Sequence, residues 1–178
     1  MKDLNWDFAI RGLLDGTLAT LGVVIGARGA DPSIIIAAGI SGGVANSLSN
    51  ILAAFSAQKA IMLNELRQVE DAMVAKDLEG TKTHQEREQT VRVKSLMDGA
   101  ATVFGALVPV LPYFFFPADL AMYSAVGVTS FLGFLIGVVM GKLSRQHVIY
   151  LGLKMAFIAI VVAAASALLQ NGLNTLLK

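Results

Sequence analysis

Several residue types that would point to particular functions are absent from this sequence or scarce in it. It has no cysteine, which excludes disulfides and thiolate metal sites. Charged residues make up only 15% of the chain, against roughly a quarter in soluble domains, and they crowd into one central segment. The net charge of +1 gives no basic field to attract nucleic acid, so we expect no nucleic-acid partner. The first residues also lack the apolar stretch and cleavage site of a removable signal peptide.

Long apolar runs take the place of the missing charges, and apolar residues make up 55% of the chain. A helix needs about 20 mostly apolar residues to cross the hydrocarbon core of a bilayer. Each run is too long and too continuous for the alternating pattern of a membrane β-barrel. We therefore predict an all-α integral membrane protein with five transmembrane helices and a cytoplasmic helical segment between spans two and three. The predicted spans are 8–27, 33–57, 95–117, 120–141 and 147–169, which divide the chain into 1–57, 58–94 and 95–178.

The distribution of lysine and arginine predicts how these spans are oriented. Cytoplasmic loops of membrane proteins carry an excess of both residues. Residues 58–94 and 142–146 are rich in them, whereas the opposite side has only Arg28 and Lys178. We therefore expect the N-terminus and residues 58–94 in the cytoplasm and the C-terminus outside. A short chain without a targeting signal favours the plasma membrane.

The charged segment 58–94 is predicted to form two helices, the first continuing the second span and the second leading into the third. Thr83 is the predicted N-cap of the later helix, with Glu86 reaching back to complete a capping box. One interpretation is a solvated hairpin that packs on itself or on a second copy. The other is a platform that collects a divalent metal, because carboxylate, imidazole and thioether groups together bind transition metals. The candidate ligands are Met62, Glu65, Glu70, Met73, His84 and Glu88.

Two carboxylates lie within the predicted spans, where an ionisable residue costs roughly 3 kcal/mol on insertion scales. Asp15 lies about two turns into the first span, and Arg11, one turn earlier, offers a local ion pair as a structural explanation. Asp98 lies at the start of the third span, where a helix dipole favours an acid. Each acid is followed by a glycine, and both spans enter from the predicted cytoplasmic side. The functional interpretation is that Asp15 and Asp98 flank one cation pathway.

The second span separates small and polar residues from large apolar ones. Close packing with interhelical hydrogen bonds explains this pattern, and so does the wall of a hydrophilic pathway; the sequence leaves both open. The small polar face comprises Gly42, Gly43, Asn46, Ser49, Asn50, Ala53 and Ala57, and the lipid face comprises Val44, Leu48, Ile51, Leu52 and Phe55.

Glycine and proline predict the packing of the later spans. Gly133, Gly137 and Gly141 form a GxxxGxxxG motif, which predicts a packing seam against another helix. Pro109 and Pro112 remove backbone donors near the end of the third span and predict a kink in that helix.

Several of these motifs resemble those of the vacuolar iron transporter family. Asp15-Gly16 followed by Thr20 resembles the first-helix motif of the family, and the similarity continues through residues 45–50, 104–113 and 135–144 in the same order. The resemblance implies a homodimer in the lipid bilayer with a cation path between the subunits. It also implies export of Fe²⁺ or Mn²⁺ from the cytosol in exchange for protons, with Asp15 as the pore carboxylate and no bound cofactor.

The second span departs from the family pattern. The family usually has an aspartate, a methionine and a glutamate where this chain has Asn46, Asn50 and Ala54. The missing thioether makes iron a poorer match and brings in manganese or another hard divalent ion. The leading hypothesis is a divalent-metal transporter, with Asp15 and Asp98 as acidic ligands, Asn46 and Asn50 as amide ligands, and Thr20 and Ser49 lining the path. The alternative is a non-transporting membrane scaffold or metal-binding protein that kept the fold.

An enzyme is not expected. The sequence shows no nucleophile–base pair, no histidine cluster and no phosphate-binding glycine loop, since its glycines lie within the spans.

Overall fold

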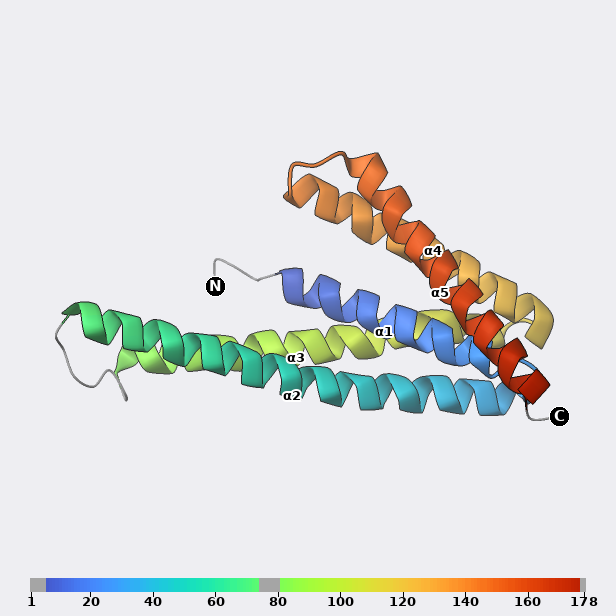
Figure 1. Ribbon diagram of the computed structural model, residues 1–178, viewed down its shortest axis with the longest axis horizontal. Helices are drawn as coiled ribbons and strands as arrows, with labels where there is room; N and C mark the ends of the chain where they lie inside the picture. Colours follow the sequence, from blue (N-terminus) through green and yellow to red (C-terminus); the bar gives the residue numbers. More distant parts are fainter. Residues whose placement is uncertain (1–5, 74–80, 177–178) are drawn as a thin grey trace.

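The computed structural model describes residues 6–73 and 81–176, and this part of the chain is entirely helical apart from short connections. The helices are α1 (Trp6–Gly26), α2 (Pro32–Met73), α3 (Lys82–Val110), the 3₁₀-helix η1 (Leu111–Phe114), α4 (Ala118–Leu143) and α5 (Val148–Leu176) (Figure 1). The five α-helices are each long and apolar enough to cross a membrane. The predicted all-α multi-pass membrane fold is confirmed.

The five helices form two groups. α3 packs along both α1 and α2, while α4 and α5 form a hairpin that crosses the first group (Figure 1). α1 contacts both members of that hairpin and so connects the groups. The beginning of α1, the end of α2, the beginning of α3 and the α4–α5 connection lie toward one end of the molecule, and the end of α5 lies toward the other. This antiparallel arrangement places every second connection on the same side.

α2 and α3 extend well past the start of α1 (Figure 1). α2 has 42 residues, and at 1.5 Å per residue its length of about 60 Å is twice the hydrocarbon thickness of a bilayer. The projecting ends pack against each other around a small core of Met62, Leu66 and Val91. The prediction that one charged helix continues the second span and another leads into the third is therefore confirmed.

The predicted start of the helix leading into the third span was wrong by two residues. α3 begins after Thr81, whose backbone is extended and whose hydroxyl accepts a hydrogen bond from the backbone N–H of His84 at 3.3 Å. Thr83 already lies inside the helix. Both threonines are acceptable N-caps, and the backbone conformation at Thr81 decides between them.

Glycines let α1 and α3 pack backbone to backbone. A Cβ added at Gly12 would overlap the carbonyl oxygen of Asp98, and one at Gly16 would overlap that of Thr102. On the other side of the contact, a Cβ at Gly105 would overlap the carbonyl oxygen of Leu13. Close approach of this kind is how membrane helices gain packing energy in the absence of a hydrophobic driving force.

The predicted glycine seam in the fourth span is confirmed, and its partner is α5. A Cβ at Gly133 would lie 3.1 Å from the carbonyl oxygen of Met155, and side chains at Gly137 and Gly141 would meet the backbone near Leu151 and Val148. The prolines lie where α3 gives way to the 3₁₀-helix. Pro109 lies in the last turn of α3, and the chain then tightens into η1.

Candidate functional site

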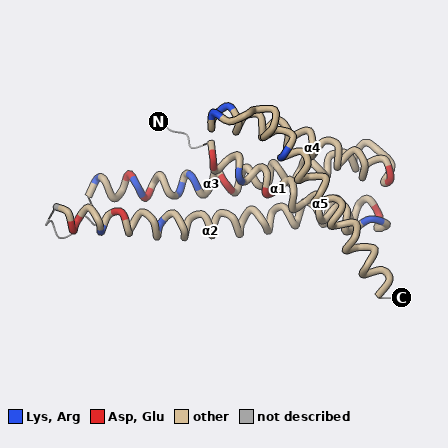
Figure 2. The backbone as a smooth tube through the Cα atoms, turned by 45° about the horizontal axis from the view of Figure 1, so that its top comes forward, with Lys and Arg blue, Asp and Glu red and all other residues tan. Residues whose placement is uncertain are grey.

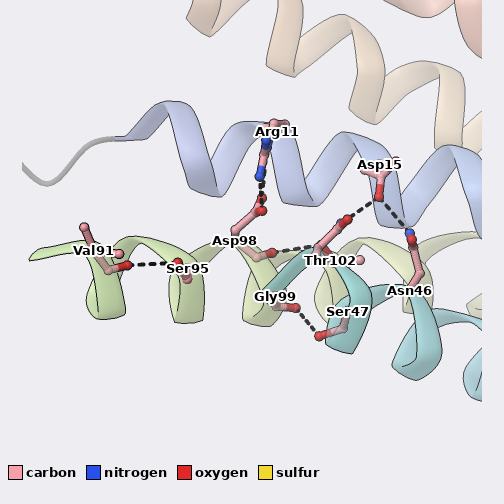
Figure 3. Close-up of polar contacts among 10 residues, drawn as sticks. Arg11, Asp15, Asn46, Ser47, Val91, Ser95, Asp98, Gly99 and Thr102 are labelled. Atoms are coloured by element: carbon pink, nitrogen blue, oxygen red, sulfur yellow. Dashed lines mark hydrogen bonds and ion pairs between the residues drawn. The ribbon is translucent and has the colours of Figure 1, made fainter. Parts of the chain in front are cut away.

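Asp15 lies near the middle of α1, and its carboxylate is the centre of a polar site between α1 and α2 (Figure 3). The side-chain amide nitrogens of Asn46 and Asn50 each donate a hydrogen bond to Oδ2 of Asp15, both at 2.7 Å. The structure thus brings together three of the predicted metal ligands, which come from positions 31 and 35 residues apart. Asp15 itself is exposed at the side of the isolated chain.

Arg11 forms its ion pair with Asp98 on α3 and not with Asp15 (Figure 3). Its Nε donates to Oδ1 of Asp98 at 3.3 Å, and its Nη2 hydrogen-bonds the other carboxylate oxygen. The expected local pair between Arg11 and Asp15 is therefore wrong. Although Arg11 and Asp15 are one turn apart on the same helix, the glycine contact at Gly12 brings α3 close enough for Asp98 to take the guanidinium.

The environment of Asp98 also differs from the one expected for an acid at a helix start. α3 begins at Lys82, so Asp98 is in the interior of a long helix, where the terminal dipole does not act. Its side chain is 0% exposed, whereas that of Arg11 is 57% exposed. A buried carboxylate needs a paired cation, and Arg11 supplies it. Both oxygens of Asp98 are thus engaged, and the structure gives it a counter-ion in place of an open metal position.

A chain of hydrogen bonds connects the two acidic positions. Asn50 donates through its amide nitrogen to the hydroxyl of Thr102 at 3.0 Å as well as to Asp15. The Thr102 hydroxyl in turn donates to the backbone carbonyl of Asp98 at 2.8 Å. Asp15, Asn50, Thr102 and Asp98 therefore form one polar layer across α1, α2 and α3.

The small polar face of α2 is narrower in the structure than in the sequence pattern. Asn46 and Asn50 are half-buried beside Asp15, whereas Ser49 points away from the other helices and is exposed. The lipid face is partly confirmed, since Val44, Leu48 and Leu52 are exposed. The remaining two residues predicted for that face are half-buried. Ile51 packs against Gly99 of α3, and Phe55 packs against the small core between the projecting ends of α2 and α3, which we call the projecting hairpin.

Thr20 lies away from the polar site. It is 1% exposed and packs against α2 where two glycines, Gly39 and Gly43, make room for it. These contacts are those of a packing residue between α1 and α2, and its place along a cation path stays a prediction.

Two of the six candidate ligands in the projecting ends of α2 and α3 are paired with arginines, and Met62 lies in the apolar core there. Arg87 donates to Glu65 at 2.7 Å, linking α3 to α2, and Arg92 donates to Glu88 at 2.8 Å within α3. The backbone of His84 belongs to the N-terminal cap of α3. Glu70 lies on α2, and the side chain of Met73 is outside the described residues. Within residues 6–73 and 81–176, no group of three histidine, aspartate or glutamate side chains is placed to hold a metal ion.

Sequence reasoning missed two polar residues at this contact, Thr102 of the polar layer and Ser47 beside it, and it missed the pairing of Arg11 with Asp98. Ser47 is buried, and its hydroxyl donates to the carbonyl of Gly99 at 2.8 Å (Figure 3). A signal for Ser47 was available, because Gly39, Gly43 and Ser47 repeat at intervals of four and form the side of α2 that is in fact buried.

Comparisons with known proteins identify a family and a relative of this chain. Residues 52–171 match the model of the VIT family, which is two thirds of the chain. The chain is also 42% identical over 167 residues to "Uncharacterized protein MJ0645" of Methanocaldococcus jannaschii, covering 92% of this chain and 87% of that protein. VIT family members are transporters and not enzymes, so membership indicates a membrane transporter of metal ions. The chain belongs to the VIT family.

Proposed function

We propose that the protein exports a divalent cation, Fe²⁺ or Mn²⁺, from the cytosol in exchange for protons, and that Asp15 binds the metal ion and the proton in turn. The observation that carries the proposal is the position of Asp15. Its carboxylate lies near the middle of a membrane-spanning helix, it is exposed at the side of the chain, and no cation of this chain is paired with it among the described residues. A carboxylate at that depth is costly unless water, a cation or another subunit covers it.

The chemistry of the site suits a hard divalent ion. Carboxylate and carbonyl oxygens suit Mn²⁺, and the absence of a thioether ligand makes Fe²⁺ a poorer match. Asn46 and Asn50 present amide nitrogens to Asp15 when no metal is bound. A half-turn of each amide exchanges nitrogen for oxygen and converts two hydrogen-bond donors into two metal ligands.

Exchange with protons follows from competition for one carboxylate. A divalent cation and a proton bind the same carboxylate oxygens, so each displaces the other. Metal binding therefore releases a proton, and metal release allows a proton to return. Arg11 is held by Asp98 and does not fill the place of the metal.

A homodimer completes the site in this proposal. On α2, the small residues Ala45, Ser49 and Ala53 repeat at intervals of four and are exposed. Such residues let a second helix approach closely. A second copy would bring its own Asp15 to the opposite wall of the path, so that two carboxylates face one divalent ion.

The proposed orientation puts the N-terminus and the projecting α2–α3 hairpin in the cytoplasm of a cell whose plasma membrane holds the protein. Figure 2 shows charged residues spread along the projecting ends of α2 and α3, while the middle of α2 has none. Lysine and arginine favour the cytoplasmic side. The α4–α5 connection, which lies toward the same end of the molecule, contains Arg145 and follows Lys142 in the last turn of α4.

Transport by purified protein in liposomes tests the function. We expect uptake of Mn²⁺ or Fe²⁺ into vesicles with an acidic interior, and loss of that uptake in Asp15→Ala. The matched control is Asp119→Asn, which removes an exposed carboxylate at the start of α4, far along the chain from the polar site. Uptake that is unaffected by the pH gradient would contradict exchange with protons.

The dimer has a separate test, because the chain contains no cysteine of its own. Ser49→Cys should form a disulfide-linked dimer on oxidation in the membrane, whereas Val128→Cys on the exposed side of α4 should not. A folded dimer that moves neither metal would support the scaffold alternative, which the existing hydrogen bonds from Asn46 and Asn50 to Asp15 also favour.

A further inference from the structure

A second site lies away from the polar layer. A surface cavity of about 500 Å³ is lined by the end of α1, the α1–α2 connection and the last turns of α5. This volume is within the roughly 300–1,000 Å³ typical of small-molecule sites. Its polar lining includes Arg28, Gln170 and Asn174, and its apolar lining includes Leu169 and Leu173. The proposed transport path uses none of these residues.

Two glycines of α1 keep this cavity open. A Cβ added at Gly26 would meet nothing within 4 Å, and one at Gly22 would meet only the hydroxyl of Ser166, at 3.4 Å. The opposite wall is fixed by a hydrogen bond of 2.6 Å from the Gln170 amide to the backbone carbonyl of Arg28. This bond ties α5 to the α1–α2 connection and holds Arg28 at the mouth of the cavity.

The charge at the mouth is available to a ligand. Arg28 is exposed, and within the described part of the chain no carboxylate lies within ion-pair distance of its guanidinium, although Asp31 is only three residues away. A guanidinium matches the geometry of a phosphate group and binds it through two parallel hydrogen bonds. Asn174, one turn beyond Gln170 on α5, adds an uncharged amide beside it.

The apolar wall faces lipid. Leu169 and Leu173 are 69% and 56% exposed, and α5 is the least buried of the five helices, with 17% of its apolar window buried. A ligand that fills this cavity therefore needs an apolar chain next to α5 and an anionic group next to Arg28, at the level where α1 ends. Inorganic phosphate meets only the second requirement.

We propose that this cavity binds one phospholipid, with its phosphate at Arg28 and Asn174 and an acyl chain against Leu169 and Leu173. The bound lipid would fill the space that Gly22 and Gly26 leave between α1 and α5, and so stabilise the contact between the two groups of helices. The site is independent of the metal path, since it shares no residue with the layer around Asp15.

Native mass spectrometry of the delipidated full chain tests the assignment. Dioleoylphosphatidylglycerol should bind at one tight site per chain, and dioleoylglycerol, which has the same chains without phosphate, about tenfold more weakly. Arg28→Gln should reduce phosphatidylglycerol to the affinity of dioleoylglycerol. Gly26→Leu should block both lipids by filling the cavity. The matched controls are Arg67→Gln, an exposed arginine of the projecting hairpin, and Gly127→Leu, whose added side chain also meets open space; both should bind like the original chain.

Equal phosphatidylglycerol binding by Arg28→Gln and the original chain would overturn the proposal. It would also be overturned if inorganic phosphate alone raised the melting temperature as much as the lipid does and lost this effect in Arg28→Gln, since the site would then be one for a free anion. Because Arg28 is an exposed loop residue, its replacement should leave the fold intact even if Gly26→Leu does not fold.

Discussion

The group α1–α2–α3 and the hairpin α4–α5 both pack their helices through glycines, but the side chains beside the two contacts differ. In both, glycines bring two helices into direct backbone contact: Gly12 and Gly16 against α3, and Gly133 and Gly137 against α5. Next to the first contact lies the layer of charged and amide side chains. Next to the second, the buried hydroxyls of Thr129 and Ser130 have no hydrogen-bond partner among the described residues. Glycines thus pack the helices in both regions, and the candidate site lies where the side chains beside the contact also hydrogen-bond from one helix to another.

The largest effect is expected from breaking the ion pair in the first group. Arg11→Gln leaves the fully buried carboxylate of Asp98 without its cation, which should lower the free energy of unfolding by about 3–5 kcal/mol. Unfolding of the purified protein in detergent micelles measures this. The double variant Arg11→Gln/Asp98→Asn removes both charges and should recover most of the loss; additive losses would show that the two side chains are not coupled.

A smaller loss of stability is expected from disrupting the glycine seam between α4 and α5. Gly137→Leu forces a side chain against the backbone near Leu151 and should cost about 1–3 kcal/mol by overpacking. Thermal unfolding followed by circular dichroism provides the measurement. Gly127→Leu on the same helix points into open space and serves as the control; an equal effect of both substitutions would mean that helix propensity and not the seam is responsible.

Two serines of α2, one buried and one exposed, distinguish the roles of its two sides. Ser47→Ala removes a buried hydrogen bond to Gly99 and should lower the free energy of unfolding by about 1 kcal/mol. Ser49→Ala should leave the stability of the single chain unchanged, because Ser49 is exposed there. If the proposed dimer is correct, metal transport should instead be more sensitive to Ser49 than to Ser47.

The smallest loss of stability is expected from breaking the Arg87–Glu65 ion pair of the projecting hairpin. Glu65→Gln breaks an ion pair whose side chains are both well exposed, 40% for Arg87 and 56% for Glu65, so the expected loss is below about 1 kcal/mol. This loss should shrink further as salt screens the pair. A large effect that is independent of salt would indicate that the pair has a role beyond holding α2 to α3.

The fold was predictable because it depends on features that lie next to one another along the chain. The length of each apolar run decides whether a helix crosses a bilayer, and the GxxxGxxxG spacing places Gly133, Gly137 and Gly141 on one side of a helix whatever its partner is. The missed start of α3 was also a local feature, but Thr81 and Thr83 are equally suitable caps and differ only in backbone conformation.

The polar site was only partly predictable. Asp15, Asn46 and Asn50 stood out because polar groups are rare in apolar spans. Ser49 was grouped with them because a face inferred from helical periodicity is wider than the part that actually touches a neighbour. The structure puts Ser47 inside and Ser49 outside, a difference of two positions on one helix.

By itself the sequence determined the number and type of the helices, the projecting charged hairpin and the family to which the chain is similar, because each depends on local composition and order. Only the tertiary structure decided that Arg11 pairs with Asp98, 87 residues away, and that Asp15 accepts hydrogen bonds from two amides. Which carboxylate pairs with Arg11 depends on the close approach of α1 and α3 at Gly12 and on the rotation of each helix about its axis. Both result from packing between distant segments, which no spacing along the chain encodes.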